Sequence, residues 1–191
     1  MGRVGLIRHG QTDLNLKGVM AGAMDIPINS EGIRQAEALA RSLKGEKVDQ
    51  IYASGLQRAY RTAEIIAVEL GLDVVRHEFL NELSQGEWEG LSLSEIKEKY
   101  PGQWEEWRKK PLVFSPPGGE SIPQVYERVV RGIRELSPHL GGKDTLIVGH
   151  QIANICLRCY FEGIELDRVW KLESPNATIN WLNIRGDYNK I

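Results

Sequence analysis

Short apolar runs separated by helical patterns are the feature that most constrains how this chain can fold. Val4 to Ile7 form a continuous apolar run of the kind found in strands that are buried on both faces of a sheet. Further strands are predicted at 48–53 and 73–75, with helical periodicity between the runs. The most economical fold for this alternation is a parallel sheet covered by helices.

Two predicted helices follow the first two strands and carry apolar residues three or four positions apart. Ser30 offers an N-cap for the first helix, which ends before Gly45. Its apolar face consists of Ile33, Ala36, Ala40 and Leu43. The second helix runs from about Leu56 to Leu70 and ends at Gly71, and its apolar face consists of Ala59, Ala63, Ile66 and Leu70. Residues 11–29 lack periodicity, and so long a loop is usually functional when a compact domain contains one.

The pattern changes between Glu78 and Ser121. This stretch contains several prolines and the tryptophans Trp88, Trp104 and Trp107. Ser92 and Glu95 form a capping box that begins a short helix, which stops before Pro101. We therefore expect an insertion of short helices at about 78–121.

After this insertion the alternation returns. Ser121 and Gln124 form a second capping box before a long amphipathic helix with the apolar stripe Ile122, Val125, Val129, Ile133 and Leu136. A buried strand at 145–148, a helix with both cysteines and a last strand at 178–184 follow. The sequence predicts an α/β fold: a three-layer αβα sandwich with a mostly parallel, doubly wound sheet and a small helical insertion. One domain is expected over residues 1–191, because domains average about 150 residues.

Composition limits the partners of the chain. Its 24 basic and 26 acidic residues give a formal charge of −2, whereas nucleic-acid binding would need a basic excess. No apolar run reaches the roughly 18 residues that span a bilayer, and the amino terminus lacks a signal-like apolar region. We expect a cytoplasmic protein whose partner is a small molecule, with no nucleic acid and no membrane.

The cysteines and two of the histidines give no metal signal. Cys156 and Cys159 are spaced as Cys-x-x-Cys, but there is no second pair, so we interpret them as buried helix residues. His77 and His139 have no neighbouring ligand cluster. No metal and no cofactor is expected.

Charged residues follow three of the predicted strands. Arg8 and His9 follow the first, Ser54 to Arg58 follow the second, and His150 follows the strand at 145–148. In open parallel sheets ligands bind beyond the carboxyl ends of the strands, so these side chains should meet. Guanidinium forks match phosphate oxygens, and histidine can donate or attack. The topology predicts a cationic site for a dianionic phosphate, although each residue alone fits a turn or a solvated helix face.

Five motifs, in order, resemble those of the histidine phosphatase superfamily, also called the phosphoglycerate mutase-like family. They are Leu6-Ile7-Arg8-His9-Gly10-Gln11-Thr12 with Asn15, Ser54-Gly55-Leu56-Gln57-Arg58-Ala59 with Thr62-Ala63, Leu80-Asn81-Glu82 with Gly86-Glu87-Trp88-Glu89-Gly90, Gly118-Gly119-Glu120-Ser121, and Val148-Gly149-His150. The resemblance covers essentially the whole chain.

This resemblance implies a site and a reaction. His9 would be the nucleophile that takes the phosphoryl group, and Arg8, Arg58 and His150 would clamp its oxygens. Such a fixed cationic clamp meets the main need of phosphoryl transfer, which is positioning and charge stabilisation. Asn15, Thr12 and the backbone after His150, at Gln151, would add hydrogen bonds.

The resemblance also implies an acid. Glu82 would protonate the leaving alkoxide and then activate the water that hydrolyses the phosphohistidine. Glu87 and Glu89 are nearby competitors for this role.

The chain departs from the family pattern at several positions. Gly55 stands where aspartate or proline is common, which should loosen only the local turn, and Gln151 replaces the most common glycine. Asn154 and Ile155 fall where many members have an arginine, with Arg158 one turn on. The resemblance therefore does not extend to the substrate contact of that arginine.

Three functions compete. We expect a metal-independent phosphomonoester hydrolase, because the stretch from Asn81 to Gly149 is compact, whereas mutases of this family have a larger insertion there. A cofactor-dependent phosphoglycerate mutase is the runner-up, with the basic run 108–110 as a carboxylate ligand or a solvated helix end. A catalytically silent phosphate-binding module is the third, although the nucleophile and the acid are both present.

The substrate is left open. Candidates are α-ribazole phosphate, phosphoserine or a broad set of phosphomonoesters, which are substrates of the phosphatases that this chain resembles. The tryptophans of the insertion, with Tyr100, would line a lid or anchor a small subdomain. A homodimer is a further expectation.

Overall fold

The central sheet contains five strands within residues 2–183, the part of the chain described by this computed structural model. The strands are Arg3–Arg8 (β1), Gln50–Ser54 (β2), Val74–His77 (β3), Thr145–Gly149 (β4) and Ile179–Asn183 (β5). They pair in the order β3-β2-β4-β1-β5, in which only β5 runs antiparallel to its neighbour. This mixed sheet confirms the predicted α/β fold.

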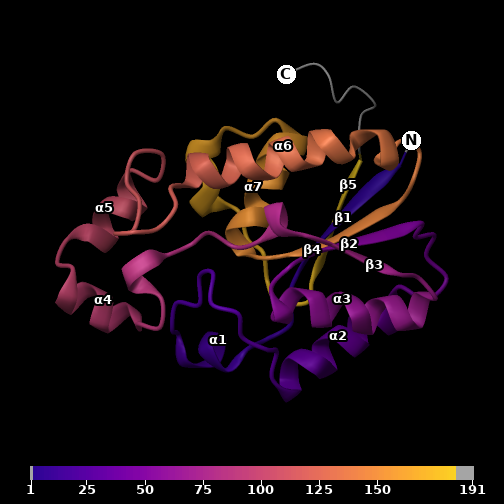
Figure 1. Cartoon of the computed structure of the whole chain (residues 1–191), viewed down its shortest axis with the longest axis horizontal. Coiled ribbons are helices and arrows are strands. Elements are labelled where there is room, and N and C mark those ends of the chain that lie inside the picture. Colours follow the sequence, from indigo (N-terminus) through magenta and orange to yellow (C-terminus); the bar gives the residue numbers. More distant parts are fainter. Residues whose placement is uncertain (1, 184–191) are drawn as a thin grey trace.

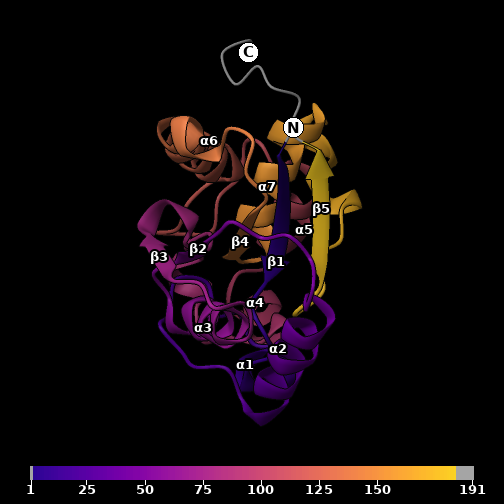
Figure 2. The same ribbon diagram turned by 90° about the vertical axis from the view of Figure 1, so that its right-hand side faces the viewer.

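Helices cover both faces of the sheet and form the outer layers of the sandwich. Helices α2 (Ser30–Ser42) and α3 (Gln57–Leu70) lie on one face, and α6 (Ile122–Leu140) and α7 (Gln151–Glu162) lie on the other (Figures 1 and 2). Each layer has its own apolar cluster: Val4 of β1 packs on the side of α6 and α7, and Ile7 packs on the side of α2 and α3. This division follows from the alternation of side chains along a strand.

The register of the sheet places three strand ends at one edge. Arg8 of β1 lies opposite Gly149 of β4, and Ala53 of β2 lies opposite Val148 of β4. The His9 N–H donates to the Gly149 carbonyl over 3.0 Å, so β1 and β4 stay paired up to their ends. The residues that follow β1, β2 and β4 therefore emerge side by side.

The beginning of α2 differs from the prediction in two respects. Asn29, not Ser30, is the N-cap, because its side chain accepts the Gly32 N–H. Ile33 is 37% exposed rather than part of the apolar face. The cause is Gly32, which packs so closely on the backbone after β1 that a Cβ there would lie 2.3 Å from the Gln11 carbonyl oxygen. This contact turns Ile33 outward.

The predicted long loop after β1 contains the short helix α1 (Asp13–Lys17). Thr12 and Asn15 form a capping box at its start, and Gly18 ends it with φ = 65°. Five residues are too few to show helical periodicity, so this helix was not predicted.

The insertion contains short helices, as expected. They are the 3-10 helices η1 (Glu78–Leu80) and η2 (Gly86–Trp88) and the α-helices α4 (Leu93–Lys99) and α5 (Gln103–Lys109). Trp88 is fully buried and Trp107 is 3% exposed, and their rings meet edge to face with centroids 5.6 Å apart. Trp107 meets Trp170 in the same way, in the 3-10 helix η3 (Leu166–Lys171). These two tryptophans anchor the insertion and do not line an open lid.

The two cysteines lie inside α7, as expected. Both are buried free thiols, and burial raises the pKa of Cys156 well above its ordinary value. The last strand, β5, ends at Asn183; Ile184, the end of the predicted strand, lies outside the described residues.

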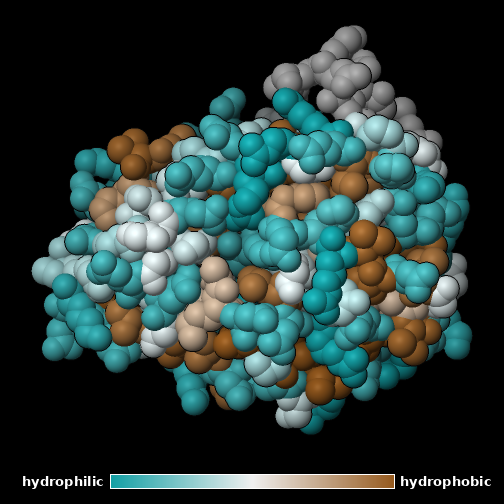
Figure 3. Space-filling view, in the orientation of Figure 1, coloured by the Kyte–Doolittle hydropathy of each residue, from teal (hydrophilic) through white to brown (hydrophobic). Residues whose placement is uncertain are grey.

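The surface is mostly polar. The face in Figure 3 carries apolar side chains only in scattered groups. None of the helices within residues 2–183 is both long and apolar enough to cross a membrane.

The packing predicts a large difference between two positions of α3. Ile66 is fully buried between this helix and the sheet, whereas Val68 is 84% exposed on the same helix. Ile66→Ala should lower the free energy of unfolding by about 2–5 kcal/mol, since it removes buried methylenes and leaves a cavity. Val68→Ala is the matched control and should change it by less than about 0.5 kcal/mol. Urea unfolding followed by circular dichroism measures both, and equal effects would contradict this packing.

Candidate active site

The side chains predicted to meet beyond the strand ends do converge. His9 is 3% exposed, Arg58 is 1% exposed and His150 is fully buried. The rings of His9 and His150 lie with centroids 5.2 Å apart. Arg8 and Arg58 are close enough to lower the pKa of both histidines by charge repulsion. The register of β1, β2 and β4 therefore assembles a buried cationic cluster.

One nitrogen of His9 is free for chemistry. The Nδ1–H donates to the Gly10 carbonyl oxygen over 2.7 Å, and this nitrogen must carry the proton because a carbonyl can only accept. In the neutral ring the lone pair then lies on Nε2. Burial, followed by the charges of Arg58 and Arg8, holds the pKa of His9 well below its ordinary value. Neutral His9 thus offers Nε2 as a nucleophile at physiological pH.

A segment near the C-terminus of the described chain holds Arg8 and His9, and sequence reasoning missed it. The Asn176 amide donates to the His9 carbonyl over 2.8 Å, and the Ser174 carbonyl accepts from Arg8 Nη1 over 3.0 Å. The Ala177 N–H donates to the Arg8 carbonyl over 2.9 Å, and Ala177 has φ = 47°, which is uncommon for a residue with a side chain. Pro175 and Asn176 are turn formers, which is the only local signal of this segment.

The two arginines are held by carbonyl groups and not by carboxylates. Arg58 donates to the Met24 carbonyl over 2.6 Å and to the Gly22 carbonyl over 2.7 Å. Within residues 2–183 neither Arg8 nor Arg58 forms an ion pair, and the Nε of each is buried without a hydrogen-bond partner. Burial lowers the pKa of both guanidinium groups. Because charge withdrawn from water is costly unless paired, this site favours an anion.

The loop that holds Arg58 is itself tied to α3. Asp25 accepts hydrogen bonds from the backbone and the side-chain amide of Gln57, over 2.7 and 2.9 Å. These bonds lower the pKa of Asp25. They also satisfy a backbone N–H in the first turn of α3, the turn that carries Arg58. Loop and helix are thus fixed together.

His150 presents the opposite nitrogen. Its Nε2 lies 2.8 Å from Ser54 Oγ, whereas Nδ1 is buried and has no hydrogen-bond partner in the described part of the chain. Burial, followed by the Arg58 charge, holds the pKa of His150 well below its ordinary value. Both histidines are therefore neutral in the free protein near pH 7.

Glu82 lies beside His150, at the N-terminus of α7. Its Oε1 accepts from the Ile152 N–H over 3.2 Å and from the Ala153 N–H over 3.3 Å, and also from the Leu83 N–H over 2.9 Å. The positive end of a helix dipole attracts a carboxylate. This contact places one carboxyl group next to the clustered histidines and arginines.

The two competing glutamates, Glu87 and Glu89, form hydrogen bonds within the insertion and its neighbouring loop. Glu87 is exposed and accepts from the Tyr100 hydroxyl over 2.8 Å. Glu89 accepts from the Ala23 N–H and the Gln85 N–H, each over 2.9 Å, and so joins the loop after α1 to the loop after Glu82. Their positions favour Glu82 as the acid.

The Gly-Gly-Glu-Ser motif has a visible structural role. Glu120 forms a two-pronged ion pair with Arg128, with distances of 3.1 and 2.9 Å, and also accepts the Ser84 N–H over 3.0 Å. Arg128 donates to the carbonyls of Phe79 and Asn81 over 2.8 and 3.0 Å. This pair braces the segment that carries Glu82.

The remaining predicted ligands are placed as follows. The Thr12 hydroxyl is buried and accepts the Asn15 N–H, while Asn15 Oδ1 accepts the Thr12 N–H, so both side chains cap α1. Gln151 is the exposed first residue of α7. Phosphate contacts by these three residues stay predictions.

The departures from the family pattern have local explanations. Gly55 leaves room for the Glu78 carboxylate, which would lie 2.2 Å from a Cβ at this position. Asn154 is buried with both amide atoms unpartnered, and Arg158 forms an ion pair with Glu162 of the same helix. Arg158 is therefore bound to its own helix.

Two other features lie apart from this cluster. The basic run 108–110 is an exposed helix end, in which Arg108 stacks on Trp170 and Lys110 pairs with Glu106.

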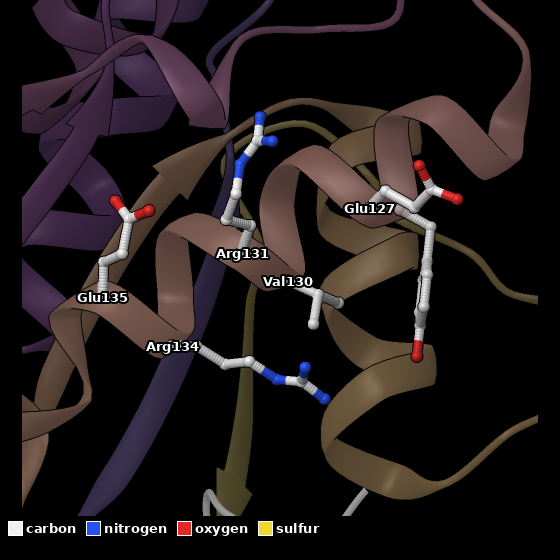
Figure 4. Close-up of a pocket in the computed structure, with 6 residues that line it drawn as sticks. Glu127, Val130, Arg131, Arg134 and Glu135 are labelled. Atoms are coloured by element: carbon white, nitrogen blue, oxygen red, sulfur yellow. The ribbon is translucent and has the colours of Figure 1, made fainter.

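A hollow of about 700 Å³ lies along α6, and Figure 4 shows that its charged side chains, Glu127, Arg131, Arg134 and Glu135, do not converge on one point. Within the described residues no three His, Cys, Asp or Glu side chains group as metal ligands.

Comparisons with known proteins agree with this geometry. The family model described as "Histidine phosphatase superfamily (branch 1)" matches residues 4–191. Phosphoserine phosphatase 1 of Hydrogenobacter thermophilus is 31% identical over 186 residues, which cover 97% of this chain and 88% of that protein. A 2,3-bisphosphoglycerate-dependent phosphoglycerate mutase of Beijerinckia indica is 33% identical over 88% of this chain and 84% of the mutase. The crystal structure of the α-ribazole phosphatase from Shigella flexneri has a TM-score of 0.88 at 28% identity, over 96% of this chain and 91% of that one.

The two neutral histidines predict a loss of stability as the pH falls below about 6.5. In the unfolded chain each takes up a proton near its ordinary pKa of about 6.5. The folded protein resists protonation there, because the pKa of His9 and of His150 is held well below that value. The unfolded state then binds more protons, so the free energy of unfolding falls with falling pH by up to about 1.4 kcal/mol per unit for each ring. Above about pH 7 this dependence vanishes.

Urea unfolding between pH 5.5 and 7.5 measures this slope. His77, whose pKa is also lowered by burial, adds to the slope, so His150→Gln should reduce the slope by about a third to a half. His139→Gln, which removes an exposed histidine, is the matched control and should leave it unchanged. An equal slope in wild type and His150→Gln would contradict a neutral buried His150.

Proposed function

Since this chain belongs to the histidine phosphatase superfamily (branch 1) and is a phosphatase of that family, we propose that it hydrolyses small phosphomonoesters through a phosphohistidine at His9. The observation that carries the proposal is the pair of guanidinium groups that form no ion pair within residues 2–183 and lie near a neutral histidine. A phosphoryl dianion supplies the missing negative charge.

In the first step His9 Nε2 attacks the phosphorus atom, and the bond to the leaving alkoxide oxygen breaks. Arg8 and Arg58 stabilise the charge on the phosphoryl oxygens, which is the largest requirement of this reaction. In the first cycle the Glu82 carboxylate takes a proton from the substrate monoanion as it binds, and Glu82 then gives this proton to the leaving oxygen. The products of the step are phosphohistidine, the free alcohol and the Glu82 carboxylate.

In the second step water attacks the phosphohistidine. Glu82 takes a proton from the water, the bond between phosphorus and Nε2 breaks, and inorganic phosphate leaves. Glu82 ends protonated and His9 ends neutral, so both groups are ready for the next cycle. The ion pair of Arg128 with Glu120, together with the Arg128 bond to the Asn81 carbonyl, holds the backbone next to Glu82 in both steps.

A phosphoglycerate mutase is the second candidate, because a mutase is among the relatives. It would return the phosphoryl group of His9 to a sugar acid and exclude water. The insertion is compact, and its basic run 108–110 lies on an exposed helix end where Arg108 stacks on Trp170, so this run does not close a carboxylate site over the cluster. These observations favour hydrolysis.

Phosphoserine and α-ribazole phosphate are the first substrates to test, because proteins similar to this chain carry those names. Metal-independent turnover, absence of a cofactor and a cytoplasmic location are parts of the proposal. A homodimer stays a prediction.

An assay in the presence of a metal chelator tests the function. The panel contains phosphoserine, α-ribazole phosphate and 3-phosphoglycerate, the last with and without 2,3-bisphosphoglycerate, and both free phosphate and 2-phosphoglycerate are followed. Free phosphate without isomerisation is expected. Isomerisation that depends on the bisphosphate, with little free phosphate, would identify a mutase, and neither product would indicate a silent binding module.

The role of Glu82 predicts a dependence on the leaving group. Glu82→Gln should slow the hydrolysis of alkyl phosphates by about 10²–10⁴-fold, since their alkoxides need a proton to leave. p-Nitrophenyl phosphate has a good leaving group and should be slowed much less in the formation of phosphohistidine. Glu87→Gln, an exposed change in the same loop, is the matched control. Single-turnover kinetics separate the two steps, and equal slowing of both substrates would exclude Glu82 as the acid.

A further inference from the structure

A chain of hydrogen bonds leads from His150 away from the predicted phosphoryl site. His150 Nε2 lies 2.8 Å from Ser54 Oγ, and Ser54 Oγ lies 2.7 Å from Asn81 Oδ1. The Asn81 Nδ2 lies 2.5 Å from Glu78 Oε2. These four side chains come from the end of β4, the end of β2 and the segment 78–81, so the sheet and the Glu82 segment meet at this chain.

The orientation of Asn81 is fixed by a backbone group. The Gly55 N–H lies 2.9 Å from the Asn81 atom that also contacts Ser54. A backbone N–H can only donate, so this atom is the carbonyl oxygen Oδ1. The other amide atom is then the NH₂ group, which suits its contact with the Glu78 carboxylate.

The direction of the Ser54 bonds follows from this orientation. A hydroxyl has one proton and can accept twice. Asn81 Oδ1 can only accept, so the Ser54 proton points to it. The Leu56 N–H donates to Ser54 Oγ over 3.1 Å. The bond between Ser54 Oγ and His150 Nε2 must therefore be donated by Nε2–H.

This fixed proton decides which nitrogen of His150 keeps its lone pair. With Nε2 protonated, the neutral ring has its lone pair on Nδ1, the buried atom without a partner. His9 is held in the opposite way, with Nδ1 protonated against Gly10 and Nε2 free. The site thus holds two neutral histidines in opposite tautomers.

We propose that Asn81 is a positioning residue that acts through the Ser54 hydroxyl to hold His150 as the Nε2–H tautomer and to present Nδ1 to the phosphoryl group. This assignment rests on the proposed function for the identity of the ligand. Nδ1 can bond a phosphoryl oxygen only through a shared proton, supplied by the substrate monoanion or by solvent. If Nε2 carried no proton, its lone pair would face the Ser54 oxygen, whose own proton is donated to Asn81. That tautomer would lose the hydrogen bond between His150 and Ser54.

The surroundings of His150 support one protonation site. Arg58 approaches from α3, Arg8 and His9 from the end of β1, and Arg128 from α6, and all of them disfavour a second proton on the ring of the free protein. Glu82, at the N-terminus of the helix that follows His150, is the nearby carboxylate. The ring therefore gains its proton at Nδ1 only when an anion enters.

The first test is the tautomer itself. The protein contains four histidines, so two-dimensional ¹H–¹⁵N NMR of protein labelled in histidine resolves them, and His77→Gln, His139→Gln and His150→Gln each assign one signal by its loss, which leaves His9 as the fourth. In the free protein at pH 7.5 we expect His150 as Nε2–H and His9 as Nδ1–H. His150 as Nδ1–H, or as an equal mixture, would overturn the proposal. This readout needs no activity, so it stands even where the proposed hydrolysis fails.

The second test uses variants of Asn81. Asn81→Ala frees the Ser54 proton, so the His150 signal should become a mixture of tautomers and kcat should fall about ten- to a hundredfold, the effect of losing one hydrogen bond in the transition state, with KM changed less. Asn81→Asp combined with Glu78→Gln keeps an oxygen that accepts from Ser54 and Gly55, and the new amide at position 78 donates to the other carboxylate oxygen at position 81. This double variant should retain the Nε2–H tautomer and most of kcat.

The matched control is Ser84→Ala, which removes a hydroxyl of the same loop that contacts Glu89 instead of Ser54. It should keep the wild-type tautomer and kcat. An Asn81→Ala protein that keeps both the tautomer and kcat would overturn the proposal, and so would a double variant, Asn81→Asp with Glu78→Gln, that loses the tautomer while folded. Should Asn81→Ala fail to fold, the wild-type spectrum and the double variant still decide.

Discussion

The structure depends on two guanidinium groups that are withdrawn from water without a carboxylate to pair with them. Arg58 is 1% exposed, and its donors are directed to the carbonyls of Gly22 and Met24, while Arg8 is held by the Ser174 carbonyl. Neutral carbonyls orient these cations but do not cancel their charge. The charge of Glu82 acts on both arginines, but desolvation outweighs it and lowers the pKa of both, so the free protein retains part of the cost of burying them. A phosphoryl dianion recovers part of that cost. Strong binding of one charge type is thus built into the folded state before any substrate arrives.

Hydrogen bonds between several loops hold this arrangement in place. The loop at 22–24, whose carbonyls bind Arg58, donates the Ala23 N–H to Glu89. Near Glu89 in the chain, Ser84 donates its N–H to Glu120, which pairs with Arg128. Arg128 in turn holds the backbone on both sides of Asn81. The cationic cluster and the segment of Glu82 and Asn81 therefore belong to one connected set of hydrogen bonds. Preorganisation of this kind lowers the reorganisation needed when charge develops in the transition state.

The sequence predicts well what depends on local pattern and poorly what depends on distant polar contacts. Apolar runs predict the strands that end near Arg8 and His150. Because ligands bind beyond the carboxyl ends of parallel strands, these strand ends predict the cationic cluster. Glu82 came only from family resemblance, because a glutamate in an acidic loop has no distinguishing pattern. Asn176 was missed, since it reaches His9 across 167 positions with only turn formers around it. Ile33 was placed on the wrong face because Gly32, whose close approach turns the helix, carries no apolar signal.

The central claim is that the phosphoryl group passes through His9 Nε2, and trapping that intermediate tests it most directly. Enzyme mixed with ³²P-labelled substrate is quenched in alkali, in which phosphohistidine is stable, and the labelled peptide is identified by mass spectrometry. The account predicts an acid-labile label on the peptide that contains His9, attached at Nε2 and absent from His9→Ala. A label on another residue, or hydrolysis that continues in His9→Ala, would contradict it.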